Sequence, residues 1–541
     1  MHLLHLVRSG FNRKTKLPLP LIVLSAMANA ALIGLVNHSA ELAAFGEPIS
    51  VRLVFLYLVL FLIFAYGNSL CWRRFNRVLQ QQLSRLRLRI ADKVRAAPLR
   101  QLEEVDEGEL LATVNHETNV LSANLPLLTG AIQSVFLLLA ALLYIATVSM
   151  AAFAIVIAVS VLGAGLFWRR RKAMNTVMTQ VLQCEGEVLT EMIGFTQGFK
   201  EIKLHADRSD SLFNAYRDST GQLRNKVIGV AGIWTTLIQF SSAFIYALLG
   251  ALIFLVPLYT DGYTDIVYKL VAAAAFCLGP LTSITSVGHL FASAEVGLAR
   301  IASIEARLAD IADPDVNKFD PDRFRAPRQI RCEGICFNYQ IPGRGTTFTT
   351  GPWTLEINSG EILFVTGGNG SGKSTAMKLI SGLYTPDSGS ISVDGTEVTS
   401  ELRSSYREIF TAIFADFHLF DRLYGLEGIA ADDVQRLIVR MGLEDKVNFE
   451  NGRFSTQALS SGQRKRLAMI VALLEDRDVY IFDEWAADQD AHFRDVFYKE
   501  LLPDLKARGK AVIAVTHDDR YWSCCDRRIT LDLGQIELGA A

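Results

Sequence analysis

The sequence predicts two parts of different fold class, an α-helical part that spans a membrane and an α/β domain that follows it. Half of the 541 residues are hydrophobic, and the mean hydropathy of +0.25 is too high for a fully soluble protein. The long apolar stretches are concentrated in the first ~300 residues, as membrane spans require. After them, short apolar runs end at Thr366, Asp483 and Val515, which is typical of the buried strands of an α/β domain.

Six stretches that are nearly free of charge are predicted to cross the membrane as helices, because each has about 20 residues or more. They cover residues 17–37, 51–70, 125–150, 151–168, 227–259 and 265–293. The third and fourth are so close that a tight turn must join them. A cleaved signal peptide is the alternative for the first stretch. That stretch is longer than an ordinary signal core and no clear cleavage site follows it, which favours a retained helix.

Basic residues flank the predicted spans on one side of the membrane. They stand before the first span, after the second and fourth, before the fifth and after the sixth, as Arg8, Arg73, Arg169, Arg224 and Arg300 illustrate. The connections at 37–41 and 260–265 contain no lysine or arginine. Because cytoplasmic loops carry the excess of basic residues, we expect both termini and the C-terminal domain in the cytoplasm.

The connections at residues 73–124 and 169–226 are too polar for lipid and too long for turns, so we expect two cytoplasmic helical arms. Short helices are predicted at their tips, near residues 102–108 and 194–204. Charged helices of this kind are usually only solvated faces, but at the end of an arm they can also contact the C-terminal domain. A stretch with proline and aspartate predicts a linker. The expected division is therefore 1–304, linker 305–327 and 328–541.

A glycine-rich loop follows the first buried strand and precedes a helix. Residues 367–374 fit the nucleotide-binding pattern of Gly, four residues and Gly-Lys-Ser/Thr. Backbone N–H groups of such a loop and the start of the next helix bind phosphates. We expect Lys373 to reach the β- and γ-phosphates and Ser374 to bind Mg²⁺. The predicted nucleotide-binding residues here are Gly367, Gly368, Asn369, Gly370, Ser371, Gly372, Lys373, Ser374 and Thr375.

Residues for hydrolysis follow the next two strands. Asp483 ends the second strand and can hold Mg²⁺, and Glu484 beside it is placed to activate the attacking water as general base. His517 follows the third strand and could contact the γ-phosphate. A carboxylate pair could be a solvated strand end, and a lone histidine is usually structural. The phosphate loop favours the catalytic interpretation, with Glu484, His517 and Lys373 as its catalytic residues.

Residues 459–466, Leu-Ser-Ser-Gly-Gln-Arg-Lys-Arg, resemble the signature motif of the ATP-binding-cassette (ABC) family. The resemblance covers 328–541. It implies an α-helical six-span transmembrane domain followed by an α/β nucleotide-binding cassette of the P-loop NTPase class, with ATP and Mg²⁺ as cofactors. It also implies that Ser460, Ser461, Gly462 and Gln463 cap ATP held by a second copy of the chain. Tyr339 matches the aromatic that stacks on adenine, and Asp488 matches the residue that links the two sites.

One position departs from the family pattern. Ala415 stands where the family usually has Gln in the loop joining the two lobes of the cassette. Alanine cannot bind Mg²⁺ or orient water. Asp416 or solvent could take that role, or the lobes could be coupled through packing at Phe414 and Phe417. Hydrolysis could therefore be slower than in a typical cassette, although Glu484, Lys373 and His517 are all present.

A narrower resemblance concerns four less common sequence segments of the cassette. Residues 367–374, 417–422, 483–490 and 516–521 are similar to the cyclic-peptide and siderophore exporter group, which includes pyoverdine, syringomycin and microcin exporters. This implies a homodimeric half-transporter in a bacterial inner membrane that moves a peptide-like product to the periplasm. A lipid or drug exporter of the same architecture is the close alternative. A membrane ATPase that transports nothing is the alternative from another class.

The expected partners are a second copy of the chain, membrane lipid and the peptide-like cargo. The net charge of −2 shows no nucleic-acid footprint, and the seven cysteines form no secreted disulfide pattern. Polar residues in the fifth and sixth spans could line a wet cargo cavity or could join helices through hydrogen bonds. They are Gln239, Ser241, Ser242, Thr282, Ser283, Thr285, Ser286 and His289.

Overall fold

The computed structural model describes residues 19–44, 46–105, 107–254, 271, 277, 279–284, 287–308, 320–340 and 347–538. The chain divides into two compact units. The first contains Met1–Asp92 with Asp106–Arg307, and the second contains Lys93–Val105 with Leu308–Ala541. Each unit is described by itself.

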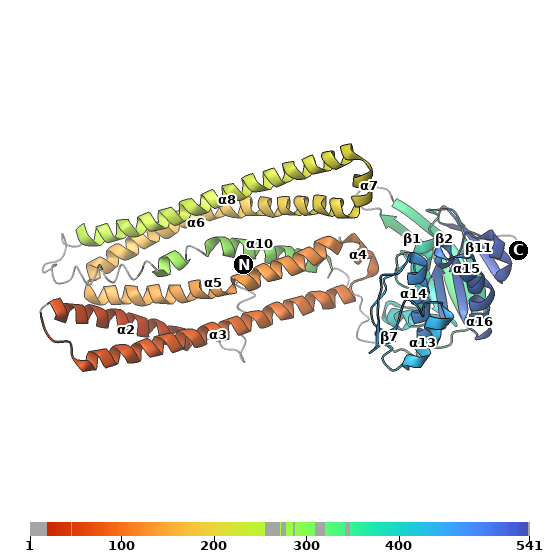
Figure 1. The fold of residues 1–541 in the computed structure, drawn as a ribbon, viewed down its shortest axis with the longest axis horizontal. Coiled ribbons are helices and arrows are strands. Elements are labelled where there is room, and N and C mark those ends of the chain that lie inside the picture. The colour runs from red at the N-terminus through yellow and green to blue at the C-terminus, as the bar shows by residue number, and fades with distance from the viewer. Residues whose placement is uncertain are drawn as a thin grey trace. The chain divides into compact units, whose positions relative to one another are not determined.

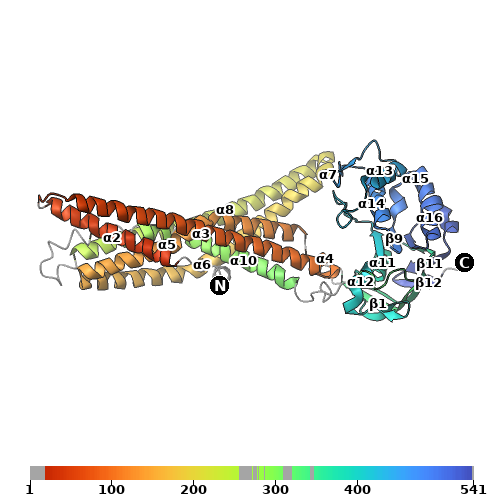
Figure 2. The same cartoon turned by 90° about the horizontal axis from the view of Figure 1, so that it is seen from below.

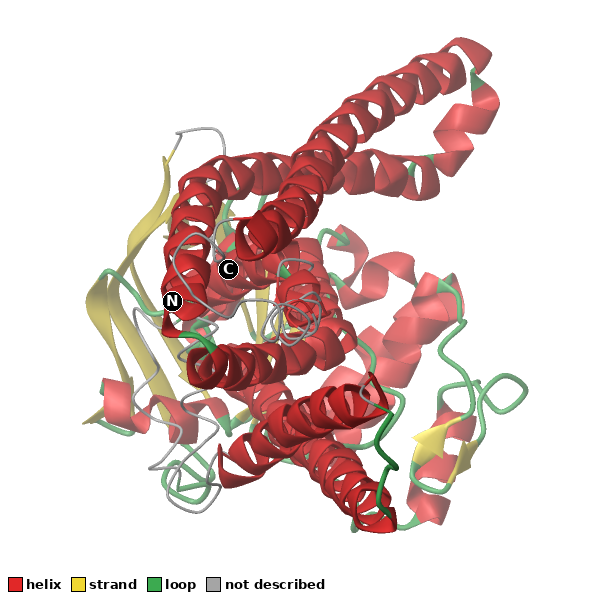
Figure 3. Cartoon of the chain, turned by 90° about the vertical axis from the view of Figure 1, so that its left-hand side faces the viewer, coloured by secondary structure: helices red, strands yellow, loops and turns green. Residues whose placement is uncertain are grey.

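The described part of the first unit is built from helices (Figures 1 and 3). Their bounds are α2 Leu19–Ala44, α3 Val51–Ala96, α5 Glu107–Val148, α6 Met150–Gln197, α7 Phe199–Leu204, α8 Ala206–Phe254 and α10 Gly288–Arg307. Helix α6 packs along α8, α2 packs on α5, and α10 packs on α5 and α6. Gly297 of α10 faces Glu117 of α5, whose carboxylate occupies the space of a missing Cβ and pairs with Arg300 at 3.8 Å.

Among the described residues, three helices are long and apolar enough to cross a membrane. They are Pro20–Ala43, Val51–Ala96 and Gly130–Val148, and they match the first three predicted spans. The predicted fourth span lies in α6 and most of the fifth lies in α8. About half of the sixth, 265–293, lies outside the described residues.

The tight turn predicted between the third and fourth spans is confirmed. Helix α5 ends at Val148 and α6 begins at Met150, so a single residue separates them. Ser149 is extended, and its hydroxyl accepts a hydrogen bond from the Ala152 N–H at 3.3 Å. This N-cap satisfies one of the free N–H groups at the start of α6.

Both arms carry a short helix at the tip, as predicted. Helix α7 connects α6 and α8, and it occupies the second half of the predicted stretch 194–204. Helix α4, Leu99–Glu104, belongs to the second unit and begins earlier than the predicted 102–108. Pro98 explains the shift, because proline lacks an N–H and fits just before or at the first turn of a helix.

The stretch predicted as a linker, 305–327, is structured at both ends. Helix α10 continues to Arg307, three residues beyond the expected end of the first domain. Phe324 is buried in the core of the second unit, and the Ala326 N–H donates to the Asp478 carboxylate at 3.0 Å. Residues 309–319 of the predicted linker lie outside the described residues.

The second unit contains two main sheets and the helices that cover them. A six-stranded sheet has the order β12-β11-β3-β10-β9-β6, and only β12 is antiparallel to its neighbour. Its strands are β3 Ile362–Thr366, β6 Phe410–Ile413, β9 Val479–Asp483, β10 Ala511–Val515, β11 Arg527–Asp532 and β12 Gln535–Leu538. An antiparallel sheet of order β2-β1-β4-β5 contains β1 Gln329–Gln340, β2 Thr347–Asn358, β4 Ser388–Val393 and β5 Thr396–Glu397. A short pair joins β7 Phe449–Glu450 and β8 Arg453–Phe454.

The remaining elements of the second unit are helices and single helical turns. The α-helices are α11 Lys373–Ile380, α12 Arg403–Arg407, α13 Ala431–Arg440, α14 Ser461–Glu475, α15 Ala491–Val496 and α16 Leu502–Ala507. The other helical turns are η2 Ser400–Leu402, η3 Trp485–Asp488, the π-helical turn η4 Phe497–Leu501 and η5 Asp519–Cys524.

The six-stranded sheet lies between two hydrophobic cores. Alternate residues of a strand point to opposite faces, so Phe364 of β3 packs in one core and Val365 packs in the other. Helices α13 and α14 cover the first core, and α11, α12 and β1 contribute to the second (Figure 2). Burial on both faces explains why β3, β9 and β10 consist mainly of apolar residues, with Thr366 and Asp483 only at the ends of β3 and β9. The predicted fold class is confirmed.

Candidate functional site

Three neighbouring parallel strands end at one edge of the six-stranded sheet. Val515 of β10 lies opposite Val365 of β3 on one side and Asp483 of β9 on the other. The segments that follow these strands therefore start side by side, which is where ligands bind in parallel α/β sheets. This register brings together the loop at 367–375, the acids at 483–484 and His517.

The phosphate loop, residues 367–375, has the backbone that its glycines predict. Gly367, Gly370 and Gly372 have φ angles of 146°, 77° and 97°, a range that glycine reaches without strain. A Cβ atom on Gly367 would collide with the Leu531 carbonyl. Gly372 is the N-cap of α11, so the unpaired N–H groups of the first helical turn border the loop. This arrangement forms an anion-binding concavity.

Two buried side chains of the loop are suited to a phosphate. Lys373 is 6% exposed, and its Nζ donates to the carbonyls of Gly367 at 3.0 Å and Gly368 at 2.9 Å. The Ser371 hydroxyl is buried and has no hydrogen-bond partner among the described residues. A buried polar group without a partner is costly, and a phosphate oxygen would supply one. The remaining predicted ligands, Asn369, Ser374 and Thr375, lie in the same loop and are exposed or half-buried.

Asp483 and Ser374 provide neighbouring oxygen atoms for a cation. Asp483 is 3% exposed and accepts a hydrogen bond from Ser374. Burial raises the pKa of Asp483, and a cation beside it would favour the charged carboxylate. Mg²⁺ keeps several waters and takes few protein ligands, so this pair fits it. No group of three or more His, Cys, Asp or Glu within the described part of the chain is placed to hold a metal.

The Glu484 carboxylate and the His517 imidazole meet at this edge. Their Oε1 and Nε2 atoms are 3.1 Å apart, and both side chains are more than a third exposed. Glu484 has a left-handed backbone with φ 51°, which is uncommon for this residue type and costs free energy. Its backbone N–H donates to the Val515 carbonyl at 3.3 Å. The strained backbone directs the side chain toward His517, as a functional residue would require.

A buried lysine that the sequence analysis did not assign holds this region together. Lys465 of α14 donates to the Glu484 carbonyl at 2.7 Å and pairs with the Asp488 carboxylate at 2.8 Å. The Trp485 indole N–H donates to the Lys465 carbonyl at 2.9 Å. The Lys465 charge is compensated inside the domain, where an unpaired charge would be costly. The sequence does show a run of basic residues after Gln463. It does not show which acceptors these residues contact, so the role of Lys465 could not be predicted from it.

The segment matching the signature motif forms the start of α14. Ser460 and Gln463 make a reciprocal capping box, which satisfies two N–H groups at the helix start. Gly462 lies against the Asp488 carbonyl, so a Cβ there would stand 2.6 Å from it. Ser460 and Ser461 are exposed. Among the described residues, the hydrogen bonds of Ser460, Gly462 and Gln463 run to α14 itself and to Gln489, and none runs to the phosphate loop.

Comparison with known proteins agrees with this geometry. The profile of the ABC transporter family matches residues 351–487. ATP-binding protein SyrD of Pseudomonas syringae pv. syringae is 31% identical over 532 residues, which is 95% of this chain and 92% of SyrD. The chain belongs to the ABC transporter family. It is therefore a membrane transporter whose ABC cassette binds ATP and hydrolyses it in a reaction coupled to transport.

Two further similarities concern a part of the chain and the fold, respectively. The syringafactin export ATP-binding/permease protein SyfD of Pseudomonas syringae pv. syringae, which is named as probable, is 32% identical over 202 residues. That match covers 34% of this chain and 30% of SyfD, so most of both chains lies outside it. A bacterial Atm1-family ABC exporter with ATP bound superimposes with a TM-score of 0.76 over 96% of this chain and 93% of that structure. At 17% identity this likeness shows the fold.

The loop that departs from the ABC pattern joins the two cores. Phe414 packs against the core that contains β1, and Phe417 packs against the core that contains α14. Ala415 is exposed, and the charge of the neighbouring Asp416 contributes to the raised pKa of Asp483. Asp416 therefore lies close enough to Asp483, the expected Mg²⁺ ligand, to raise its pKa. This placement is compatible with Asp416 taking the role of the missing Gln, and also with coupling of the lobes through Phe414 and Phe417.

Tyr339, the residue expected to stack on adenine, lies near the end of β1 opposite Phe348 of β2. Its side chain is half-buried and packs partly against the core. The side chain of Tyr339 thus packs in part against the core of the cassette, and the rest of it is accessible. This placement suits stacking, and it also suits a residue at the margin of the core.

Helix α4 docks on the ABC cassette through residues that the sequence analysis did not name. Glu103 accepts hydrogen bonds from Lys378 at 2.7 Å and from the Tyr384 hydroxyl. The Arg100 guanidinium lies 5.2 Å from the ring centre of Phe337, which stacks on Tyr384. Lys378 belongs to α11, the helix that begins at Lys373. The tip of the first arm is therefore bonded to the helix that follows the phosphate loop.

The polar residues predicted to line a cargo cavity are only partly described. Gln239 and Thr282 are exposed and Ser242 and Ser283 are half-buried. The Thr282 hydroxyl donates to the Gly279 carbonyl at 2.8 Å, a bond within its own helical segment. Thr285 and Ser286, and the side chains of Ser241 and His289, lie outside the described residues. The cavity assignment stays a prediction.

Proposed function

We propose that the chain is a homodimeric half-transporter that exports a cyclic or non-ribosomal peptide, a siderophore precursor or a similar peptide-like product. The direction is from cytoplasm to periplasm across a bacterial inner membrane. The similarity to SyrD carries this proposal, because it extends over 95% of the chain and includes the membrane helices. It agrees with the resemblance of four cassette segments, 367–374, 417–422, 483–490 and 516–521, to the cyclic-peptide and siderophore exporter group.

The proposed dimer follows from the position of the signature segment. Ser460 and Ser461 are exposed, and the described contacts of this segment do not reach the phosphate loop of the same chain. In a two-fold homodimer the segment of each copy would complete the ATP site of the other. ATP would then join the two cassettes, and hydrolysis would release them.

Each predicted site residue has a role in this proposal. Lys373 and the loop N–H groups bind the β- and γ-phosphates, and Ser374 and Asp483 hold Mg²⁺, which would neutralise charge on the phosphates. Glu484 takes a proton from the attacking water. His517, 3.1 Å from Glu484, keeps that carboxylate oriented and contacts the γ-phosphate. Asp488, paired with Lys465, fixes the loop that approaches the partner cassette.

Export itself is tested by comparing the culture medium of a deletion strain with that of its parent. The deletion should remove a peptide-like product from the medium and retain it in the cells, and the intact gene should restore export. Loss of a lipid or a drug-resistance phenotype instead would favour the alternative exporters. ATP hydrolysis in sealed vesicles without movement of the retained product would favour a non-transporting ATPase.

Removal of the Tyr339 ring is expected to weaken ATP binding. Tyr339→Ala should raise the KM for ATP about three- to tenfold, since an aromatic contact contributes about 0.5–1.5 kcal/mol. Tyr339→Trp should stay within about twofold of the wild type, because it keeps a flat aromatic face. ATP titration of the purified protein measures both. Equal KM values in all three proteins would assign Tyr339 to the core of β1 and β2.

Breaking the contact between α4 and α11 is expected to uncouple transport from hydrolysis. Glu103→Ala removes the acceptor of both Lys378 and Tyr384. Export should fall roughly tenfold, which is within the range that a coupling free energy of about 1–3 kcal/mol gives. ATP hydrolysis should change much less, because the phosphate loop is intact. Export and ATPase activity are measured on the same vesicles.

The neighbouring carboxylate provides the matched control for this substitution. Glu104 is exposed and is on the same short helix, so Glu104→Ala removes the same charge without touching α11. It should leave both activities within about twofold, as surface substitutions usually do. Equal losses of export in the two variants would show that the charge of α4 matters rather than its contact with Lys378.

A further inference from the structure

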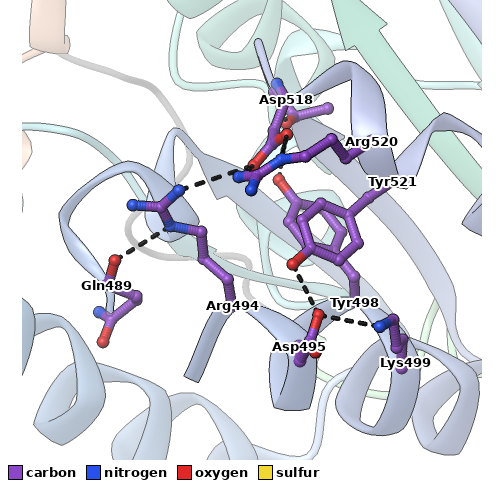
Figure 4. A network of polar contacts seen from close by, with 9 residues as sticks. Gln489, Arg494, Asp495, Tyr498, Lys499, Asp518, Arg520 and Tyr521 are labelled. Atoms are coloured by element: carbon purple, nitrogen blue, oxygen red, sulfur yellow. Dashed lines mark hydrogen bonds and ion pairs between the residues drawn. The ribbon is translucent and has the colours of Figure 1, made fainter. Parts of the chain in front are cut away.

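The segment after β10, which carries His517, is held by one helical stretch. Residues 516–521 contact α15 and η4 through hydrogen bonds, ring stacking and an ion pair (Figure 4). Tyr498 and Thr516 share a hydrogen bond of 2.6 Å, and the Tyr521 hydroxyl donates to Asp495 at 2.6 Å. The rings of Tyr498 and Tyr521 stack at 4.3 Å. Arg494 forms an ion pair with Asp518.

Arg494 is the only one of these side chains in Figure 4 that also reaches the loop after Glu484. Its Nε donates to the Gln489 carbonyl at 3.0 Å, and its Nη1 lies 3.8 Å from the Asp518 carboxylate. The planar guanidinium presents several donors in fixed directions, so one side chain can span both loops. Gln489 in turn donates to the Gly462 carbonyl of α14 at 3.1 Å. Arg494 thus connects the loop of His517 with the loop that packs on the signature segment.

The Asp518 end of this bridge is itself fixed. Arg520 donates two hydrogen bonds to the Asp518 carboxylate, at 2.8 and 2.6 Å, and they lower the pKa of Asp518. The Asp518 N–H donates to the Thr516 hydroxyl at 3.1 Å. The carboxylate therefore stays charged and holds one orientation, directly after His517 in the chain.

The site edge and the bridge border the same cavity. A cavity of about 330 Å³ is lined by Glu484, His517, Arg494 and Asp518, among other residues. Arg494 is therefore on the wall of the space into which Glu484 and His517 project. The π-helical turn η4 follows Arg494 closely. Pro503 at the start of α16 accounts for this turn, since proline cannot donate the α-helical hydrogen bond.

We propose that Arg494 is a positioning residue for ATP hydrolysis, which holds the loop of His517 against residues 484–489 so that His517 stays in contact with Glu484. The inference rests on the proposed catalytic roles of Glu484 and His517. It assigns no contact between Arg494 and ATP. Its effect should therefore appear in turnover and leave ATP binding unchanged, because the phosphate loop lies on β3 and α11.

The first experiment compares Arg494→Gln with the wild type in the full-length protein. We expect kcat to fall roughly tenfold and the KM for ATP to stay within about twofold. Arg494→Lys should recover only part of kcat, because a single ammonium cannot make both contacts of the guanidinium. Unchanged kcat in Arg494→Gln would overturn the proposal, and so would a KM increase that accounts for the whole loss.

A matched control removes a positive charge from the same network. Lys499 pairs with Asp495 at 3.0 Å and is 58% exposed. It belongs to η4, and its contacts are with Asp495 and Tyr521. Lys499→Gln should keep kcat within about twofold. An equal loss in Lys499→Gln would show that net charge or the fold of η4 explains the effect, and the proposal would then be wrong.

The decisive measurement is a double-mutant cycle with His517→Ala. If Arg494 acts through His517, Arg494→Gln should cost little further activity once His517 is gone. A full tenfold loss in the His517→Ala background would assign Arg494 another role and overturn the proposal. Glu484→Gln serves as the separate test of the proposed function. If that variant hydrolyses ATP normally, the catalytic assignment fails, whereas failure of the Arg494 cycle alone leaves that assignment intact.

Discussion

Glu484→Gln is expected to reduce ATP hydrolysis by about 10²- to 10⁴-fold, the contribution typical of a general base. Glutamine has the shape of glutamate and can keep the contact with His517, but it cannot accept the proton of the attacking water. ATP binding should persist, because Lys373 and the phosphate loop are unchanged. The variant should therefore accumulate as ATP-bound closed dimers, which size measurements with and without ATP would detect.

An exposed carboxylate elsewhere in the cassette serves as the control for Glu484. Glu500 lies in η4 and is exposed, so Glu500→Gln makes the same chemical change away from the sheet edge. It should retain turnover within about twofold. Full turnover in Glu484→Gln would defeat the assignment of the base, and loss of ATP binding in that variant would show a structural defect instead.

Lys373→Ala is expected to lose most of the affinity for ATP. A hydrogen bond to a charged group contributes about 1.5–3 kcal/mol, so its loss should raise the dissociation constant for ATP about 10- to 150-fold. The lysine is 6% exposed and donates hydrogen bonds to two carbonyls of its own loop. It is also the one charged side chain among residues 367–375, so no neighbour in the loop can replace its charge. Direct binding of ATP, measured without turnover, separates this effect from that of Glu484→Gln.

Lys446 provides a lysine control outside the loop. It is exposed, and its substitution by alanine should leave the dissociation constant for ATP within about twofold. If Lys373→Ala bound ATP as tightly as Lys446→Ala, the loop at 367–375 would not be the phosphate site. The thermal stability of each variant should be measured beside binding, since Lys373 also satisfies two loop carbonyls.

The sequence was informative where function depends on residues close together in the chain. The phosphate loop lies within nine positions, and its glycines, strand and helix are all local features. The capping box of Ser460 and Gln463 also joins residues three positions apart. Such patterns can be recognised without knowing the fold, because local backbone geometry determines them.

The residues that the sequence did not reveal act through contacts between distant segments. Glu103 and Lys378 are 275 positions apart, and Lys465 reaches Glu484 across 19 positions. Arg494 is on a helix whose apolar and charged residues give no sign of which loops it faces. Only the folded chain brings these partners together. A charged side chain in sequence alone is most simply a solvated one.

The two long helices α6 and α8 have a mechanical consequence. Helix α8 is an unbroken element of 49 residues, which at 1.5 Å per residue is about 74 Å long. It packs along α6, whose 48 residues are also unbroken. Such a pair acts as a stiff lever. A tilt of about 5° around the end beside α7 displaces the other end by about 6 Å, so a small rotation at the tip of the pair becomes a movement of side-chain size at its opposite end.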